Sequence, residues 1–128
     1  MANIIELKNI NKTYGKRVKT KVLKNINLSI EEGSFNSIIG ASGSGKTTLL
    51  NLIGTLDKPS SGEIYIDGKI INKVSRRTLS KMRNETIGFV FQFHYLLPEF
   101  NVIENVLMPS KIRSFFKIGR EIGRASCR

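Results

Sequence analysis

The order of apolar and polar residues predicts two strands near the start of the chain. Apolar and polar side chains alternate in residues 5–10 and again in residues 22–30, as they do in strands that bury one face. Because the two segments lie close together in the sequence, they predict an antiparallel layer. Residues 11–16 between them are polar apart from one tyrosine and predict a loop.

Three further segments have the composition of strands. Residues 35–39 predict a buried strand despite their two polar side chains. Residues 86–91 form a nearly continuous apolar run, which is typical of a strand buried on both faces. Residues 63–66 predict a strand that ends at Asp67 and Gly68, a pair favoured in hairpin turns.

Helical periodicity and terminal residues predict three helices. A short helix is expected from residue 46 to residue 53, where a glycine follows. Residues 75–84 are basic and helical in pattern. Asn101, with Glu104 three positions later, resembles a capping box at the start of a third helix. That helix is expected to end before Pro109.

The segment between the strand at 35–39 and the first helix carries the clearest chemical signal. Residues 40–47 read Gly-Ala-Ser-Gly-Ser-Gly-Lys-Thr and fit the phosphate-binding pattern GxxxxGK[ST] without a mismatch. The glycines permit positive φ and a close backbone approach, so that the amides form a concave site for oxyanions. A strand, this loop and a helix in that order form the supporting arrangement. An accidental Gly/Ser turn is the alternative, which the correctly placed Lys46 and Thr47 argue against.

We therefore expect the loop to bind a nucleoside triphosphate. Lys46 supplies a positive charge for the terminal phosphates, and the Thr47 hydroxyl suits a Mg²⁺ ligand. The helix that begins at Lys46 directs the positive end of its dipole towards the same phosphates. The predicted cofactor-binding residues of the loop are Gly40, Ala41, Ser42, Gly43, Ser44, Gly45, Lys46, Thr47 and Thr48.

Composition narrows the class of protein. With 128 residues, of which 40% are hydrophobic, the chain is expected to form one small domain with a core. No apolar run reaches the length that spans a bilayer, and the first residues lead directly into a strand pattern, so we expect a cytoplasmic protein. The single cysteine, Cys127, has no partner for an internal disulfide.

The net charge of +11 raises the possibility of binding to nucleic acid or to a membrane surface. The charge is uneven, because residues 111–128 contain six basic side chains against Glu121 alone. The remaining lysines are scattered over predicted loops and exposed faces. We therefore expect no nucleic-acid partner.

Beyond the phosphate-binding loop, several segments resemble a known family. They are Tyr14 in NKTYGK, residues 38–68 and residues 87–109. From about residue 4 to residue 112 the chain resembles the ATP-binding subunits of ABC transporters. Within them it is most similar to the lipoprotein-releasing, LolD-type ATPases, which group with the MacB and FtsE-like ATPases. The resemblance implies an α/β fold, a P-loop NTPase core with an N-terminal antiparallel β layer, truncated before the helical subdomain is complete.

The resemblance also implies roles for residues outside the loop. Tyr14 would stack on adenine, although a tyrosine covering the sheet edge is the structural alternative. Gln92 would coordinate Mg²⁺ together with Thr47 and help to place the attacking water, so that Lys46 and Gln92 are the expected catalytic residues. An ordinary polar strand end is the alternative for Gln92. Residues 92–98, which include His94, would contact the transmembrane permease subunit.

Parts that such an ATPase needs are absent from the sequence. After Gln92 the acidic residues are Glu99, Glu104 and Glu121, and none follows an apolar strand as a Mg²⁺-binding aspartate would. The LSGGQ signature and the switch histidine are absent as well. We therefore expect residues 1–117 to be a partial ATP-binding domain.

The last residues have a different character. Residues 118–128 are expected to be a non-native tail, because the end of this segment resembles a translated sequencing adapter. A divergent or frameshifted C-terminus is the alternative. A sheet truncated in this way leaves an unpaired edge and an exposed apolar face, from which we expect poor solubility.

The expected function follows from the family. The intact protein would be a homodimer that binds ATP and Mg²⁺, lies on the inner face of the cell membrane and couples hydrolysis to its permease partner, here for lipoprotein release. This chain alone is expected to bind nucleotide weakly at most and to show no steady turnover. The alternative is a natural, truncated and non-catalytic protein that binds nucleotide or an ABC partner and regulates it. A GTPase or a small kinase fits neither Tyr14 nor the segment around Gln92.

Overall fold

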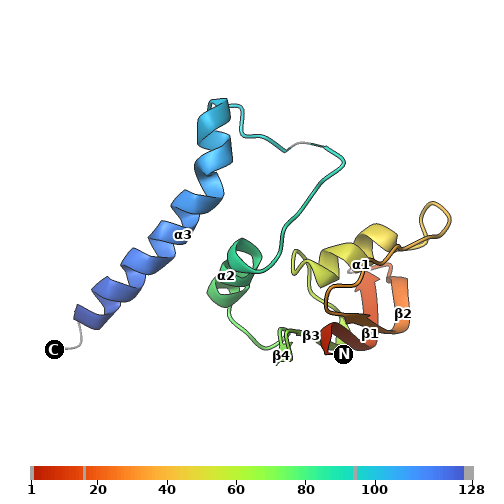
Figure 1. The fold of residues 1–128 in the computed structure, drawn as a ribbon. Helices are drawn as coiled ribbons and strands as arrows, with labels where there is room; N and C mark the ends of the chain where they lie inside the picture. Colours follow the sequence, from red (N-terminus) through yellow and green to blue (C-terminus); the bar gives the residue numbers. More distant parts are fainter. Residues whose placement is uncertain (1, 16, 94, 126–128) are drawn as a thin grey trace. The chain divides into compact units, whose positions relative to one another are not determined.

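The first part of the chain forms a four-stranded antiparallel sheet (Figure 1). The computed structural model describes residues 2–15, 17–93 and 95–125. The strands lie in the order β2-β1-β3-β4. The elements in chain order are β1 (Asn3–Tyr14), β2 (Thr20–Glu31), α1 (Lys46–Ile53), β3 (Ser61–Ile66), β4 (Lys69–Ile70), α2 (Arg76–Glu85) and α3 (Val102–Ala125).

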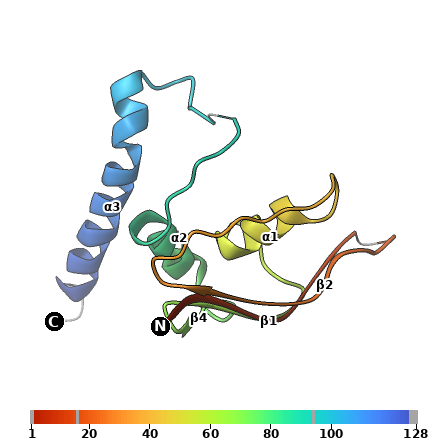
Figure 2. The same ribbon diagram turned by 45° about the vertical axis from the view of Figure 1, so that its right-hand side comes forward.

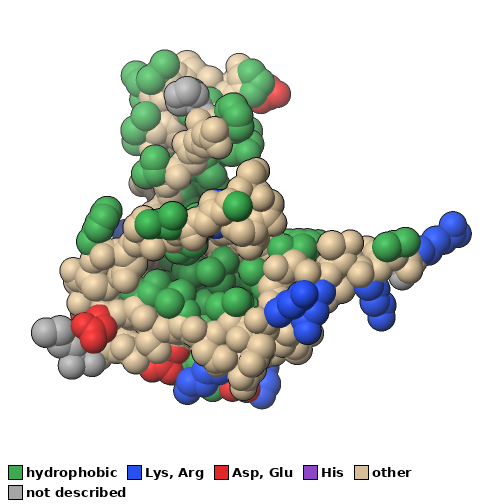
Figure 3. All heavy atoms as spheres, turned by 90° about the vertical axis from the view of Figure 1, so that its right-hand side faces the viewer, with side chains coloured by type: hydrophobic (Ala, Val, Ile, Leu, Met, Phe, Trp, Pro, Cys, Tyr) green, Lys and Arg blue, Asp and Glu red, His purple; other side chains and the backbone are tan. Residues whose placement is uncertain are grey.

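The hairpin of β1 and β2 confirms the predicted antiparallel layer and is longer than expected. Residues 11–14, predicted as a loop, continue β1 because they pair with the start of β2, as Tyr14 does with Thr20. The loop that follows carries exposed Arg17 and Lys19, and Lys21 is exposed at the start of β2. Figure 3 shows Lys and Arg side chains at the projecting end of the molecule on the face drawn.

Four asparagines hold an irregularity in the middle of this hairpin. Asn9 and Asn25 have left-handed backbones, with φ of 52° and 48°, next to shifts in the strand register. The amide of Asn9 donates to Asn27 Oδ1 over 2.9 Å, and the amide of Asn25 donates to Asn11 Oδ1 over 3.0 Å. Bulges increase the local twist of a strand pair. The far end of the hairpin accordingly curves to the level of α1 (Figure 2).

Helix α1 lies over one face of this sheet (Figures 1 and 2). Its Leu52 is fully buried, as are Ile10 and Ile64 in the strands, and Leu7 is 2% exposed. Leu7 and Ile64 are direct cross-strand partners. A small apolar core therefore fixes the sheet and the helix that follows the phosphate-binding loop.

The predicted turn after β3 is confirmed. Asp67 and Gly68 have φ of 50° and 67°, as a two-residue hairpin loop of positive φ requires. They join β3 to β4, and Ile66 pairs with Lys69 across the turn.

The chain divides into two units, Met1–Ser75 and Arg76–Arg128, and the second is helical. The predicted capping box is confirmed at α3: the amide of Glu104 donates to Asn101 Oδ1, and the amide of Asn101 donates to Glu104 Oε2, both over 2.9 Å. The side chain of Asn84 in α2 donates to the carbonyl of Pro109 over 2.9 Å. The predicted boundary between residues 117 and 118 falls inside α3 and stays a prediction.

Two strand predictions and one helix end are wrong. Residues 35–39 and 86–91 are neither strand nor helix, and Phe35 and Val90 are 99% and 103% exposed. A strand buried on both faces needs neighbours to pair with its backbone, and no described strand lies beside either segment. Helix α3 does not end before Pro109 but continues through it to Ala125. A proline within a helix costs one backbone hydrogen bond without always ending the helix.

In the described part of the chain, none of the helices has the length and apolar character that crossing a membrane requires.

Candidate phosphate-binding site

The candidate site, residues 40–48, consists of a loop and the first turn of α1. Gly45 occupies the N-cap position with φ of 94°, and no described side chain caps the helix there. The amides of the first helical turn lack partners inside the helix, and the helix dipole places positive charge at this end. Such a helix start attracts an anion.

Two glycines of the loop lie close to neighbouring side chains. A Cβ on Gly40 would lie 2.8 Å from Ser44 Oγ. A Cβ on Gly45 would lie 2.9 Å from Leu23 Cδ2 and 3.3 Å from the carbonyl oxygen of Val22, and the positive φ adds backbone strain. The loop is therefore folded closely on itself and packed against β2.

The half-buried side chain of Lys46 folds back over the loop that precedes it. Its ammonium donates to the carbonyl oxygens of Gly40 and Ala41 over 2.8 and 2.6 Å and lies 3.5 Å from Ser44 Oγ. The ammonium has three donors, and neutral acceptors leave its positive charge uncompensated. The structure thus places a cation against the loop, beside the helix N-terminus.

Thr47 and Thr48 differ in their surroundings. Thr47 is exposed at the start of α1, so its hydroxyl is accessible to a ligand. Thr48 is half-buried, and its side chain lies close enough to the phenol of Tyr14 to act on its pKa. The structure therefore brings Tyr14, at the end of β1, to the helix that carries the loop.

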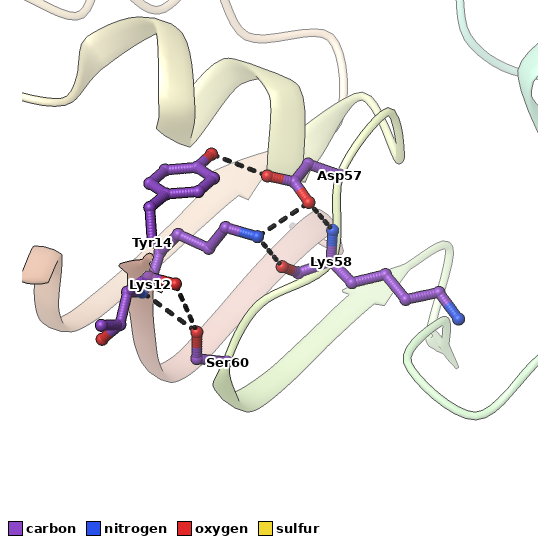
Figure 4. Close-up of polar contacts among 6 residues, drawn as sticks. Lys12, Tyr14, Asp57, Lys58 and Ser60 are labelled. Carbon is purple, nitrogen blue, oxygen red and sulfur yellow. Dashed lines mark hydrogen bonds and ion pairs between the residues drawn. The ribbon is translucent and has the colours of Figure 1, made fainter. Parts of the chain in front are cut away.

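Tyr14 belongs to a compact polar cluster (Figure 4). Its hydroxyl donates to Asp57 Oδ2 over 2.7 Å. Lys12, only 8% exposed, donates to Asp57 Oδ1 over 2.7 Å and to the carbonyl of Lys58 over 2.6 Å. The Lys12 ammonium also lies 4.7 Å from the centroid of the Tyr14 ring, within range of a cation–π interaction. Nearby, the amide of Thr13 donates to the Ser60 hydroxyl over 3.0 Å.

These contacts change the acidity of both groups. Burial by itself would raise the pKa of Asp57, but the hydrogen bonds from Lys12, Tyr14 and its neighbouring amide outweigh it, so the pKa lies below the ordinary value. The hydrogen bond to Asp57 raises the pKa of the Tyr14 phenol, and partial burial acts in the same direction. The cluster therefore holds a carboxylate and a neutral phenol at neutral pH.

Gln92 lies in the second unit, on an exposed segment without helix or strand. Aromatic rings surround it in the sequence: Phe89 and Phe91 stack with centroids 5.4 Å apart, and Tyr95 meets Phe91 edge to face at 5.2 Å. The pairing of Gln92 with Thr47 stays a prediction. His94 lies outside the described residues.

Comparison with known proteins identifies the family. The family model described as ABC transporter matches residues 23–126. The LolD ATP-binding protein of the lipoprotein-releasing system of Bacteroides thetaiotaomicron is 50% identical over 109 residues, which cover 85% of this chain and 49% of that protein. This chain belongs to the ABC transporter family.

Other relatives agree with this family assignment. The ABC transporter ATP-binding protein YxdL of Bacillus subtilis is 49% identical over 85% of this chain and 42% of its own length. The solved ATP-binding cassette MJ0796, a dimer bound to ADP and Pi, has a TM-score of 0.78 and 50% identity over 82% of this chain and 46% of that chain. The predicted ABC ATPase fold class is therefore confirmed. The chain spans about half the length of the relatives it matches.

Sequence reasoning missed part of the polar cluster in this ABC transporter chain. The sequence pattern gives Asp57 no role, and it places Lys12 in the predicted loop of residues 11–16. Lys12 and Asp57 lie 45 positions apart, and no local pattern links positions so distant. The local signal for the cluster is the spacing of Lys12 and Tyr14: in a strand, residues two positions apart lie on the same face.

Proposed function

We propose that this chain is the N-terminal part of an ABC transporter ATP-binding subunit, and that residues 40–48 bind the phosphates of ATP. One observation carries the proposal: the Lys46 ammonium spans the loop carbonyls beside an uncapped helix N-terminus. A cation beside the unpaired amides of a helix N-terminus suits a polyphosphate better than any uncharged ligand.

The residues at the start of α1 also fit Mg²⁺. Magnesium prefers oxygen ligands and is commonly held by few protein groups together with substrate phosphates. The hydroxyl of the exposed Thr47 is such a group, and the side-chain oxygen of Gln92 is the second proposed Mg²⁺ ligand. Among the described residues no group of three His, Cys, Asp or Glu side chains could hold a metal ion by itself. These few protein ligands suit a Mg²⁺ ion that is held partly by the phosphates of the nucleotide.

Each proposed site residue has a separate task. Lys46 neutralises charge on the terminal phosphates, Gln92 orients the attacking water, and the partly exposed ring of Tyr14 stacks on adenine. The backbone of residues 40–45 and the side chains of Thr47 and Thr48 complete the site. This chain alone binds nucleotide weakly and does not turn it over steadily, since the sequence holds no residue pair that follows an apolar strand to bind the metal and activate water.

The partners follow from the relatives and from the second unit. Relatives named for lipoprotein release and a dimeric solved cassette support a homodimeric subunit of a lipoprotein-releasing transporter, located at the inner face of the cell membrane. Its permease would contact residues 92–98, where Phe93, Tyr95 and Leu96 are each about two-thirds exposed or more, at 66%, 72% and 66%. Exposed aromatic and apolar side chains of this kind suit a protein interface.

Isothermal titration calorimetry with ATP and Mg²⁺ tests the phosphate site. Lys46→Ala should weaken binding by roughly ten- to 100-fold, since it removes a charge-assisted contact. Lys24→Ala removes the same charge from an exposed position on β2 and should leave the affinity unchanged. Equal affinity of the Lys46→Ala variant and the unmodified chain would contradict the proposal.

A further inference from the structure

Tyr14 is held at two places by groups that take no part in phosphate binding. Its hydroxyl is bonded to Asp57 Oδ2, and the Lys12 ammonium lies 4.7 Å from its ring centroid. Lys12 is 8% exposed, whereas Tyr14 is 42% exposed. Tyr14 therefore keeps an accessible part, while the ammonium beside its ring is nearly buried.

The Asp57 carboxylate is itself fixed in orientation. Its Oδ1 accepts from Lys12 and from the amide of Lys58, each over 2.7 Å, while Oδ2 is left for Tyr14. Figure 4 shows the two oxygens turned to these different partners. A carboxylate with distinct partners on each oxygen cannot rotate without losing hydrogen bonds, so it is a rigid acceptor for the phenol.

This rigidity matters for recognition of a flat ligand. An aromatic ring at a strand end beside an exposed loop would otherwise lose side-chain freedom when it stacks, and that loss weakens binding. We propose that Asp57 and Lys12 are positioning residues that hold the Tyr14 ring in the orientation in which it stacks on the adenine of ATP. The inference rests on the proposed function and deepens it, because it assigns the orientation of the stacking ring to Asp57 and Lys12.

The same sheet contains a matched arrangement away from Tyr14. Tyr65 donates to Glu63 Oε2 over 2.7 Å, and the Lys8 ammonium lies 4.7 Å from its ring centroid. Tyr65 pairs with Glu6 near the start of β1, whereas Tyr14 is at the end of β1. Tyr65→Phe thus removes a tyrosine hydroxyl that is bonded to a carboxylate, as Tyr14→Phe does, but at a place away from the proposed adenine site.

The test measures the affinity of the 128-residue chain for Mg·ATP and for inorganic tripolyphosphate by calorimetry. Tyr14→Phe keeps the ring and removes only the hydroxyl that donates a hydrogen bond to Asp57. We expect it to weaken ATP binding about three- to tenfold and to leave tripolyphosphate binding unchanged within about twofold. Tyr14→Ala removes the ring and should weaken ATP binding by roughly five- to 100-fold. Tyr65→Phe should change neither affinity.

Asp57→Asn and the double variant with Tyr14→Phe test the coupling. The Asp57→Asn side chain would keep an acceptor for the Lys58 amide and lose the charge that fixes Lys12, so ATP binding should weaken as in Tyr14→Phe. Because both changes break the same contact, the double variant should bind ATP no more weakly than either single variant. Lys12→Met is a further variant that places no unpaired charge in the buried position, and it should show the same selective loss for ATP.

Three outcomes would overturn the inference. The first is wild-type affinity for ATP in Tyr14→Phe and Asp57→Asn. The second is an equal loss for ATP and tripolyphosphate in Asp57→Asn and Lys12→Met, which would reduce the pair to a structural link between β1 and the segment after α1. The third is absence of any binding by the unmodified chain, which overturns the proposed function as well. Weaker binding of both ligands in Lys46→Ala, with no selective effect at Asp57, leaves the proposed function intact and rejects only the positioning role.

Discussion

Lys12, Asp57 and Tyr14 show how a nearly buried cation is accommodated at the residue scale. A buried ammonium is costly unless it is paired and fully hydrogen-bonded. Lys12 has a carboxylate, a carbonyl and an aromatic face as partners, and its ion-paired side chain is 10% exposed, against 32% for Asp57. The cost of removing Lys12 from water is therefore offset by contacts that also join the end of β1 to the segment after α1.

The lowered pKa of Asp57 predicts a dependence of stability on acid. The unfolded carboxyl has a pKa of about 3.9, above that of the folded state, so unfolding takes up a proton in this range. The stabilising contribution is complete above the unfolded value and is lost as the pH falls through the folded value. Urea unfolding at pH values from about 7 down to about 3 should show a steeper loss of stability for the unmodified chain than for Asp57→Asn.

Glu6 provides the reference for that comparison. Its pKa is lowered by hydrogen bonds from Asn3 and Lys8, so it contributes to acid sensitivity in both proteins. Parallel stability curves for the two proteins in acid would show that the Asp57 pKa is not lowered by folding.

At the scale of elements, α1 and β2 are coupled through a single glycine. Gly45 is the N-cap of α1 and also the point where the loop contacts Leu23 and Val22 of β2. The left-handed backbone starts the helix, and the missing Cβ lets the strand approach. The geometry of the phosphate-binding loop thus depends on how the helix and the strand pack.

Gly45→Ala should therefore be more harmful than the same change at another left-handed glycine. Gly68 has φ of 67°, and a Cβ added there would meet no atom within 4 Å, so Gly68→Ala should cost only the backbone strain, about 1–2 kcal/mol. Gly45→Ala adds a steric clash at 2.9 Å and should destabilise more and weaken ATP binding. Thermal unfolding and calorimetry measure the two effects, and equal results for both variants would contradict this packing argument.

At the scale of the whole molecule, large apolar side chains are unusually exposed. Figure 3 shows a broad group of them on the face drawn. In the first unit Phe35 and Ile39 are 99% and 90% exposed, and in the second Val90 and Val102 are 103% and 79% exposed. Surfaces of this kind promote association in water.

We therefore expect the isolated chain to self-associate at micromolar concentration. Val90→Ser should reduce association, measured by sedimentation velocity, with little change in the free energy of unfolding, because the side chain is fully exposed. Ile64→Ser is the contrasting variant: the side chain is fully buried, and the change should destabilise the sheet by about 2–5 kcal/mol. The expectation would be contradicted if the unmodified chain sedimented as a monomer and Val90→Ser left its sedimentation unchanged.

The sequence by itself determined the features that depend on near neighbours in the chain. The helix from Lys46 to Ile53, the capping box at Asn101 and the turn at Asp67 were all predicted correctly, because glycine conformation, capping and periodicity act over a few residues. The phosphate-binding pattern is equally local as a sequence signal, because its glycines, Lys46 and Thr47 lie within eight consecutive residues.

Only the tertiary structure decided the features that require distant partners. Residues 35–39 and 86–91 have the composition of buried strands but remain exposed, because pairing and burial depend on neighbouring strands rather than on composition. The β1–β2 hairpin extends to Tyr14 because residues 11–14 find partners at the start of β2. Lys12 and Asp57 meet across 45 positions because the sheet and α1 pack around one core, and that packing places Tyr14 beside the phosphate-binding helix.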